Sequence, residues 1–299
     1  MTRAAGSGVG VLILLCLLCH SADAQMLHLD PIPYTTPADS TSRLALVVDV
    51  DRFDEAKFGW SLNRILLTAV LPAGEVGTFF LRLSHLTFNT GDISVSNRWP
   101  WVLGEVHREA QDGWPNETRL NGFGKIELGV TGPAVLPLIR GVDYGLALGL
   151  PTGSDRLYPF SAQSIPFRIG LRKPIVIGAG FQAGVSAGYL IHADSGGEDW
   201  DATAFPSGHN FGASLARYGR RGSRWQLTWD LRNDSGRRSQ LVGAQGWVPW
   251  TDDGSVGLKI SREIQGSLDR PAEWYFTISF RFDSPKYRPG NEIKPTLVD

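Results

Sequence analysis

The sequence contains almost no cysteine: only Cys16 and Cys19 carry a thiol, and both lie within the N-terminal segment. The rest of the chain therefore cannot form a disulfide framework, a thiolate metal site or a cysteine nucleophile. A strong charge of one sign is also lacking, because 29 basic residues face 30 acidic ones and the net charge is -1. Such a chain has no long-range field that attracts nucleic acid. We therefore expect no nucleic-acid partner.

A short apolar run near the N-terminus predicts a secretory signal peptide over residues 1–24. The run extends from Val9 to Cys19, and Ala22-Asp23-Ala24 follows with the small-x-small pattern that signal peptidases recognise. An uncleaved anchor helix is the first alternative, but spanning a bilayer takes about twenty apolar residues. A lipidated Cys19 is the second, and the bulky Leu18 before it disfavours this.

Apolar and polar residues alternate along most of the remaining chain, which is the pattern of strands with two different faces. The alternation is unbroken from Trp225 to Arg232 and recurs from Trp274 to Phe282. Most predicted strands have about nine to thirteen residues, whereas strands of soluble proteins average about five or six. Membrane-spanning strands need about nine to eleven. The predicted strands cover residues 43–52, 57–71, 76–88, 122–131, 141–150, 164–173, 179–193, 208–218, 223–233, 239–249, 255–264 and 273–282.

We therefore predict an all-β fold, a transmembrane up-and-down antiparallel β-barrel of about 12 strands, with ten to fourteen left open. Long connections such as 89–121 alternate with short ones such as 219–222, as in outer-membrane barrels. Tryptophans near strand ends predict aromatic girdles at the two membrane interfaces. These tryptophans are Trp60, Trp225, Trp247, Trp250 and Trp274.

The domain organisation follows from these elements. After the signal peptide, residues 25–42 form a periplasmic N-terminal segment, residues 43–282 form the barrel, and residues 283–299 form a periplasmic tail. The predicted location is the outer membrane of a Gram-negative bacterium. The expected partners are outer-membrane lipid, the barrel assembly machinery and a small-molecule solute.

One segment permits a different interpretation. Residues 174–191 are almost entirely apolar, and Gly180, Gly184 and Gly188 have the G-x-x-x-G spacing of packed membrane helices. Because both flanking segments alternate with period two, we expect a strand here and keep a transmembrane helix as the alternative.

Three features give the chain a family resemblance: residues 149–154 (Gly-Leu-Pro-Thr-Gly-Ser) at a strand-to-loop junction, Val106-His107-Arg108 in the long loop, and a closing strand that ends at Phe282. With these features the chain resembles families of small Gram-negative outer-membrane β-barrels that have no assigned reaction. It resembles more weakly the barrels associated with the meta-pathway of phenol degradation, which implies uptake of hydrophobic compounds. The chain departs from the pattern in one respect, because 17 residues follow Phe282 where such barrels usually end on an aromatic.

A search for catalytic groups finds no complete set. Residues 233–236 (Asn-Asp-Ser-Gly) are similar to the serine segment of twelve-stranded outer-membrane phospholipases, but those enzymes need a histidine where this chain has Asn233. Ser235 therefore has no local general base, and a surface turn is the simpler interpretation. No two histidines after the signal peptide have the spacing of metal ligands. We expect no enzyme activity, no metal and no cofactor.

The expected function is that of a channel or porin-like transporter for small solutes or hydrophobic compounds. A structural or interaction barrel with a blocked lumen is the alternative, and a barrel enzyme of the lipid-hydrolysis type is the third choice. The candidates for a lumen lining are the inward polar residues Arg82, Lys125, Glu127, Asp230, Arg232, Lys259 and Arg281. If the long loop folds inward, the candidates for a constriction are Glu105, His107, Arg108 and Glu109; if it caps the barrel outside, they lie away from the channel.

Overall fold

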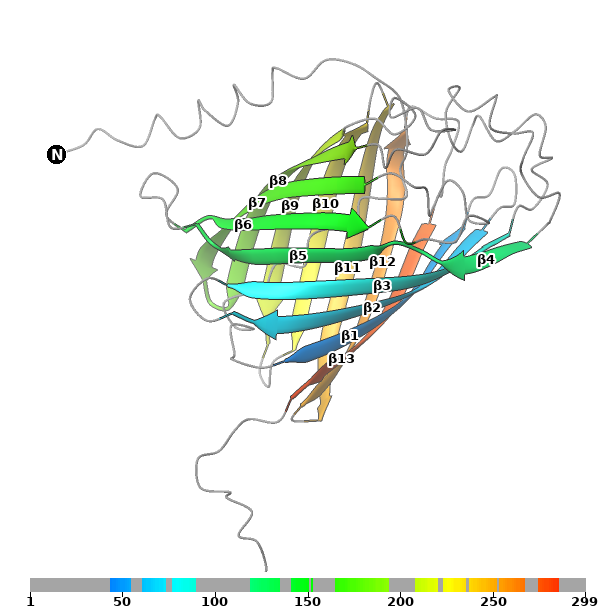
Figure 1. Ribbon diagram of the computed structural model, residues 1–299. Helices are drawn as coiled ribbons and strands as arrows, with labels where there is room; N and C mark the ends of the chain where they lie inside the picture. The colour runs from blue at the N-terminus through cyan, green and yellow to red at the C-terminus, as the bar shows by residue number, and fades with distance from the viewer. Residues whose placement is uncertain are drawn as a thin grey trace, which may run out of the picture.

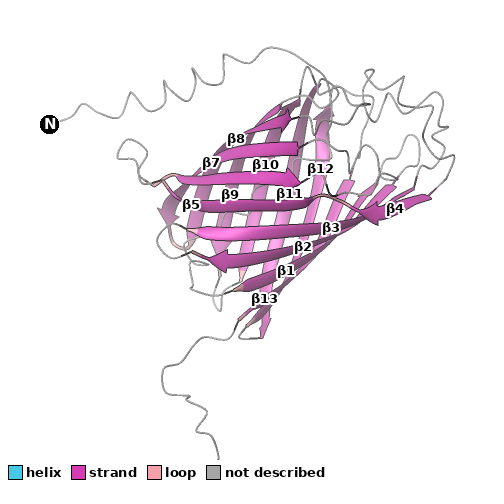
Figure 2. Cartoon of the chain, in the orientation of Figure 1, coloured by secondary structure: helices cyan, strands magenta, loops and turns pink. Residues whose placement is uncertain are grey.

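The computed structural model is an all-β structure in the residues that it describes (Figure 2). In that part of the chain no helix is long and apolar enough to cross a membrane. The described residues are 44–54, 61–73, 77–89, 119–134, 141–150, 152, 165–193, 208–219, 223–234, 237–251, 253–266 and 274–284.

The strands form a single closed antiparallel sheet, a barrel that Figure 1 shows from the side. Each strand pairs with its neighbours in sequence, and the first strand pairs with the last, which closes the ring. β4 and β5 both pair with β3, one after the other, and so make one interrupted strand of a twelve-strand barrel. The predicted fold and strand number are confirmed. The strands are β1 Ala45–Asp54, β2 Ser61–Pro72, β3 Thr78–Asn89, β4 Arg119–Phe123, β5 Ile126–Pro133, β6 Asp143–Leu150, β7 Ile165–Gly178, β8 Phe181–Ala193, β9 Gly208–Tyr218, β10 Arg224–Asp234, β11 Arg237–Thr251, β12 Gly254–Gly266 and β13 Trp274–Asp283.

The interruption between β4 and β5 is a difference from the sequence prediction, which has one strand over 122–131. Gly124 and Lys125 lie between the two pieces, and the Gly124 amide donates a hydrogen bond to the Ser84 carbonyl over 2.8 Å. The side chain of Ser84 occupies the space at Gly124, since a Cβ there would lie 2.1 Å from the Ser84 Oγ. An extra residue at such a point bends the strand, and β4 accordingly continues at an angle to β5 in Figure 1 while it stays paired with β3.

The apolar segment 174–191 is a β-hairpin, so the alternative of a transmembrane helix is wrong. β7 runs on to Gly178, five residues beyond its predicted end at 173, and Pro174 pairs with Gly184 of β8. The turn consists of Ala179 and Gly180, whose φ angles of 50° and 80° lie in the left-handed region that favours glycine. The low polarity of the segment reflects an outward face that is apolar and an inward face that includes the small residues Gly184, Ser186 and Gly188.

Every strand presents two different faces, as the alternation predicts. In β13, Ile278 on the outer face is 45 % exposed, whereas its neighbour Ser279 on the inner face is only 3 % exposed. The partners of Ile278 across the two seams are Val50 and Leu258, which are also exposed. An apolar outer surface and a polar inner surface in one closed sheet are the arrangement of a barrel surrounded by lipid.

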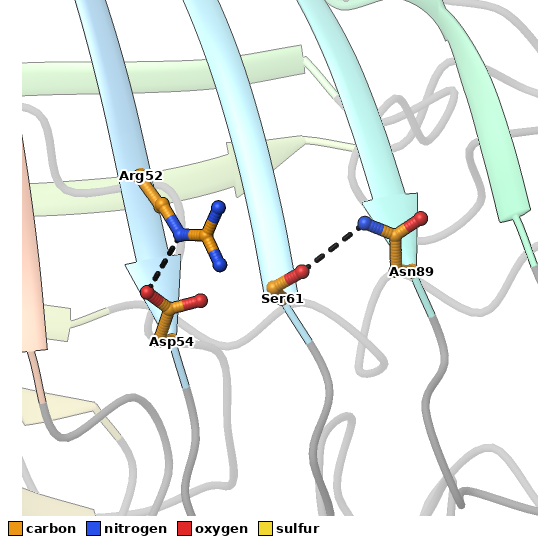
Figure 3. A network of polar contacts seen from close by, with 4 residues as sticks. All are labelled: Arg52, Asp54, Ser61 and Asn89. Carbon is orange, nitrogen blue, oxygen red and sulfur yellow. Dashed lines mark hydrogen bonds and ion pairs between the residues drawn. The ribbon is translucent and has the colours of Figure 1, made fainter.

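The outer face becomes polar at the loop end of β1, β2 and β3. Arg52 Nε donates to Asp54 Oδ2 over 2.7 Å, and Asn89 Nδ2 donates to Ser61 Oγ over 3.1 Å (Figure 3). Since polar side chains on the lipid side are costly inside the hydrocarbon, this row of four residues marks where the wall leaves the apolar layer.

Of the four described tryptophans that were predicted to form girdles, three lie on the outer face and one does not. Trp225, Trp250 and Trp274 lie exposed on the outer face, and Trp250 contacts Phe282 with 6.0 Å between ring centroids. Trp247 was expected in the same girdle, but it faces inward, because its register partner is the inward-facing Gly257. A Cβ at Gly257 would lie 2.8 Å from the Trp247 ring. Trp60 lies outside the described residues.

Candidate functional site

The inner wall of the barrel holds the buried polar side chains of the residues that the structure describes. Alternation in each strand turns these side chains inward, so strands that are far apart in sequence contribute to one interior surface. A small apolar cluster also lies there, in which Phe80 and Ala147 pack with Val70. The buried polar residues are Asp51, Thr68, Arg82, Thr131, Arg168, Gln182, Ser261 and Ser279.

Three of the inward side chains form an ionic triad. Arg82 Nη1 lies 3.1 Å from Glu127 Oε1, and Arg168 Nη2 forms an ion pair with Glu127 Oε2. The three side chains are 8 %, 13 % and 8 % exposed for Arg82, Glu127 and Arg168. Each carboxylate oxygen thus binds a different guanidinium, and the triad as a whole carries one excess positive charge.

The triad joins β3, β5 and β7. Arg82 and Glu127 are register partners on neighbouring strands. Arg168 reaches Glu127 across β6, whose inward residues Gly145, Ala147 and Gly149 have little or no side chain. The small residues of β6 are therefore what allows the second arginine to reach the carboxylate.

A second ion pair lies on β1 and β2. Asp51 and Arg64 are register partners, and Arg64 Nη2 lies 2.5 Å from Asp51 Oδ2. The Arg64 guanidinium also lies 5.6 Å from the centroid of the Phe53 ring, a cation–π distance. The hydrogen bond fixes the Asp51 carboxylate and the stacking fixes the Arg64 guanidinium, so both charged groups have set positions on the inner wall.

The lumen candidates from the sequence lie on several parts of this wall. Arg82 and Glu127 are members of the triad. Lys125 lies two residues before Glu127, so alternation turns it to the same side, and it is partly buried. Arg281 lies 2.9 Å from Asp283, an inward-facing pair on β13.

The remaining lumen candidates lie on β10 and β12. Asp230 is partly buried on β10, and its Oδ1 would lie 2.9 Å from a Cβ at the inward-facing Gly212. Lys259 is partly buried on β12 and pairs in register with Thr277. The backbone of Arg232 pairs with Asn210 and Ser239 in β10. A role of any of these residues in transport stays a prediction.

The constriction candidates Glu105, His107, Arg108 and Glu109 lie outside the described residues. So does Ser235 of the phospholipase-like segment. Among the described residues, no group of three or more histidine, cysteine, aspartate or glutamate side chains could hold a metal ion.

The sequence reasoning missed several inward-facing charged residues that the structure brings into this wall, among them Asp51, Arg64, Arg168 and Arg172. The signal for the two β7 residues was present, because Arg168 and Arg172 alternate with Phe167, Ile169 and Leu171. What the alternation does not show is which residue of another strand lies opposite each arginine.

The middle part of the inner faces of β8 and β9 is lined with small residues: Gly184, Ser186, Gly188, Gly212 and Ser214. A Cβ at Gly184 would lie 3.7 Å from Nε of Arg172, which shows that this guanidinium lies across the surface of β8. Gly188 and Gly212 similarly face Asn210 and Ser186. Small side chains on this side leave space beside the long basic side chains of β7.

Comparison with known proteins supports the fold. No protein-family profile and no curated protein matches the sequence. An outer-membrane channel from Pseudomonas putida F1 has a similar structure, with a TM-score of 0.55 and 10% identity over 88% of this chain and 100% of that one. The KdgM porin in complex with disordered oligogalacturonate gives a TM-score of 0.46 and 7% identity over 81% and 99%. The Ralstonia pickettii toluene transporter TbuX gives 0.43 and 8% over 80% and 87%. The chain thus has the fold of an outer-membrane barrel.

Proposed function

We propose that the chain is a channel for small polar solutes in the outer membrane of a Gram-negative bacterium. The observation that supports this proposal is the inner wall, which carries charged residues on nine of the described strands while the outer wall is apolar. A barrel that served only as an anchor would need no such set of inward charges, because apolar side chains would fill the interior at lower cost. The similar fold of a known outer-membrane channel agrees with the proposal.

The proposal includes a route to the membrane. Residues 1–24 direct export, the barrel assembly machinery inserts residues 43–282, and the apolar outer face contacts outer-membrane lipid. Residues 25–42 and 283–299 then lie in the periplasm. Hydrophobic compounds, which the resemblance to phenol-degradation barrels implies, are the second class of solute, but the ionic triad and the Asp51–Arg64 pair favour polar ones.

A barrel with a blocked lumen is the competing function, and one observation favours it. The triad holds three long side chains together on the inner wall, and such pairs also fill narrow barrels that conduct nothing.

Conductance of the purified, refolded protein in planar lipid bilayers separates the two. A channel gives stepwise current increases in 1 M KCl that are absent when heat-denatured protein is added. If folded protein gives no steps, the proposed channel is wrong and the blocked barrel takes its place. Liposome swelling in arabinose and in toluene-saturated buffer then tests polar against hydrophobic solutes.

The long loop has a separate test. If Glu105, His107, Arg108 and Glu109 form a constriction, deletion of residues 100–115 increases the conductance several-fold, because a short segment occupies much of a barrel of this size. An unchanged conductance would place the loop outside the channel.

A further inference from the structure

The inward charges are unevenly distributed around the barrel. The inner faces of β3, β5, β6 and β7, together with Lys125 in the interruption between β4 and β5, form what we call the basic wall. Its charged residues are the bases Arg82, Lys125, Arg168 and Arg172 and the acids Glu127 and Asp143. The basic residues therefore outnumber the acidic ones by two on this wall.

Among the side chains that the structure describes, the opposite side of the ring carries equal numbers of bases and acids. Because the strand order runs once around the barrel, β10, β11, β12 and β13 lie across the interior from the basic wall. Their described inward-facing charges are three bases and three acids: Arg224, Lys259, Arg281, Asp230, Glu263 and Asp283. Between the two sides, β1 and β2 contribute Asp49, Asp51 and Arg64.

The basic residues also extend along the barrel rather than around one level. Arg168 and Arg172 share the inward face of β7, four residues apart, which is about 13 Å along a strand. The Arg172 guanidinium lies over Gly184 on β8, and Arg172 is the register partner of Asp143 on β6. A solute moving along this wall would therefore pass from one cation to the next.

We infer that the basic wall makes the channel selective for anions, and that its solutes are small carboxylates; this inference rests on the proposed channel function. A guanidinium offers several charged donors to a carboxylate, and Arg82 and Arg168 already bind one, that of Glu127, through one oxygen each. A row of fixed cations in a narrow passage lowers the energy of an anion and raises that of a cation at close range.

The first test is the reversal potential across a bilayer with a tenfold KCl gradient. The parent protein should favour chloride over potassium. Arg172→Gln removes one cation of the basic wall and should lower the permeability ratio roughly twofold to tenfold, the effect of a unit charge within several ångströms in a partly screened passage. Asp143→Asn removes an acid from the same wall and should raise the ratio, so a shift in either direction stays measurable if one variant fails to fold.

The matched control is Lys173→Gln. Lys173 is the next residue of β7 and carries the same charge, but it is exposed on the outer face. Its substitution should leave the ratio unchanged. An equal change for Lys173→Gln and Arg172→Gln would show that the wall is not the source of selectivity.

The second test is the choice of solute. Succinate added to one side should reduce the chloride current, whereas neutral succinamide at the same concentration should not, and Arg172→Gln should weaken the block by succinate. A conducting channel that prefers potassium, or that responds equally to both compounds, would overturn the inference and leave the channel function intact. A folded parent protein that does not conduct would instead overturn the channel function itself.

Discussion

Ile278 offers the sharpest test of which side of the barrel faces lipid. It lies midway on the outer face of β13, four residues from Trp274 at one end and four from Phe282 at the other. Four residues span about 13 Å along a strand and about 10 Å along the barrel axis at a tilt near 40°. The apolar band of such barrels is about 25 Å tall, so Ile278 lies close to the middle of the bilayer.

Ile278→Arg should therefore place a charge near the bilayer midplane. The cost of arginine there is about 2–4 kcal/mol, which lowers the folding equilibrium constant roughly 30- to 700-fold. The control is Thr277→Arg, one residue away on the inner face, where Asp51 and Lys259 are the register partners. An arginine there enters a polar surface and has an acid beside it.

The assay is refolding of both variants into lipid vesicles along a urea gradient. The fraction folded is read from the shift in gel mobility between unboiled and boiled samples, since closed barrels resist SDS until heated. Ile278→Arg should fold only at much lower urea than the parent, while Thr277→Arg should stay close to it. Equal midpoints for the two variants, or a larger loss for Thr277→Arg, would refute the assignment of the two faces.

Three further predictions concern the interior. Glu127→Gln removes the carboxylate between Arg82 and Arg168. It should lower the free energy of unfolding, measured by urea titration, by about 3–5 kcal/mol. A loss no larger than that of the control variant Asp230→Asn would contradict a structural role of the triad. Gly129→Ala should lower the urea midpoint of unfolding, because a Cβ there would lie 2.2 Å from the Phe80 ring and 2.5 Å from the Leu146 carbonyl oxygen. Adding Phe80→Leu to this variant should restore part of the lost midpoint. No recovery would show that the clash with the Leu146 carbonyl, and not the one with Phe80, causes the loss. Trp247→Ala should increase single-channel conductance, because the Trp247 ring lies on the inner wall over Gly257. The control Trp250→Ala, on the outer face, should leave the conductance unchanged. An increase for Trp250→Ala and none for Trp247→Ala would show that Trp247 faces the lipid.

The sequence alone determined the class of the fold and the face of almost every strand residue. Period-two alternation is a local property of the backbone, so Trp225 to Arg232 and Trp274 to Phe282 show their inward and outward residues without any knowledge of neighbours. Strand length then separates membrane barrels from soluble sandwiches, because the bilayer sets a minimum span.

Only the tertiary structure decided which residues meet. The pairing of Arg168 with Glu127 depends on the register of three strands and on the small residues of β6 between them. The break between β4 and β5 depends on Ser84 of β3. Trp247 near a strand end has the sequence context of a girdle residue, and its inward position follows from its pairing with Gly257. Register is a relation between distant segments: the hydrophobic pattern limits it to steps of two residues, and the turns and contacts between strands select one of them.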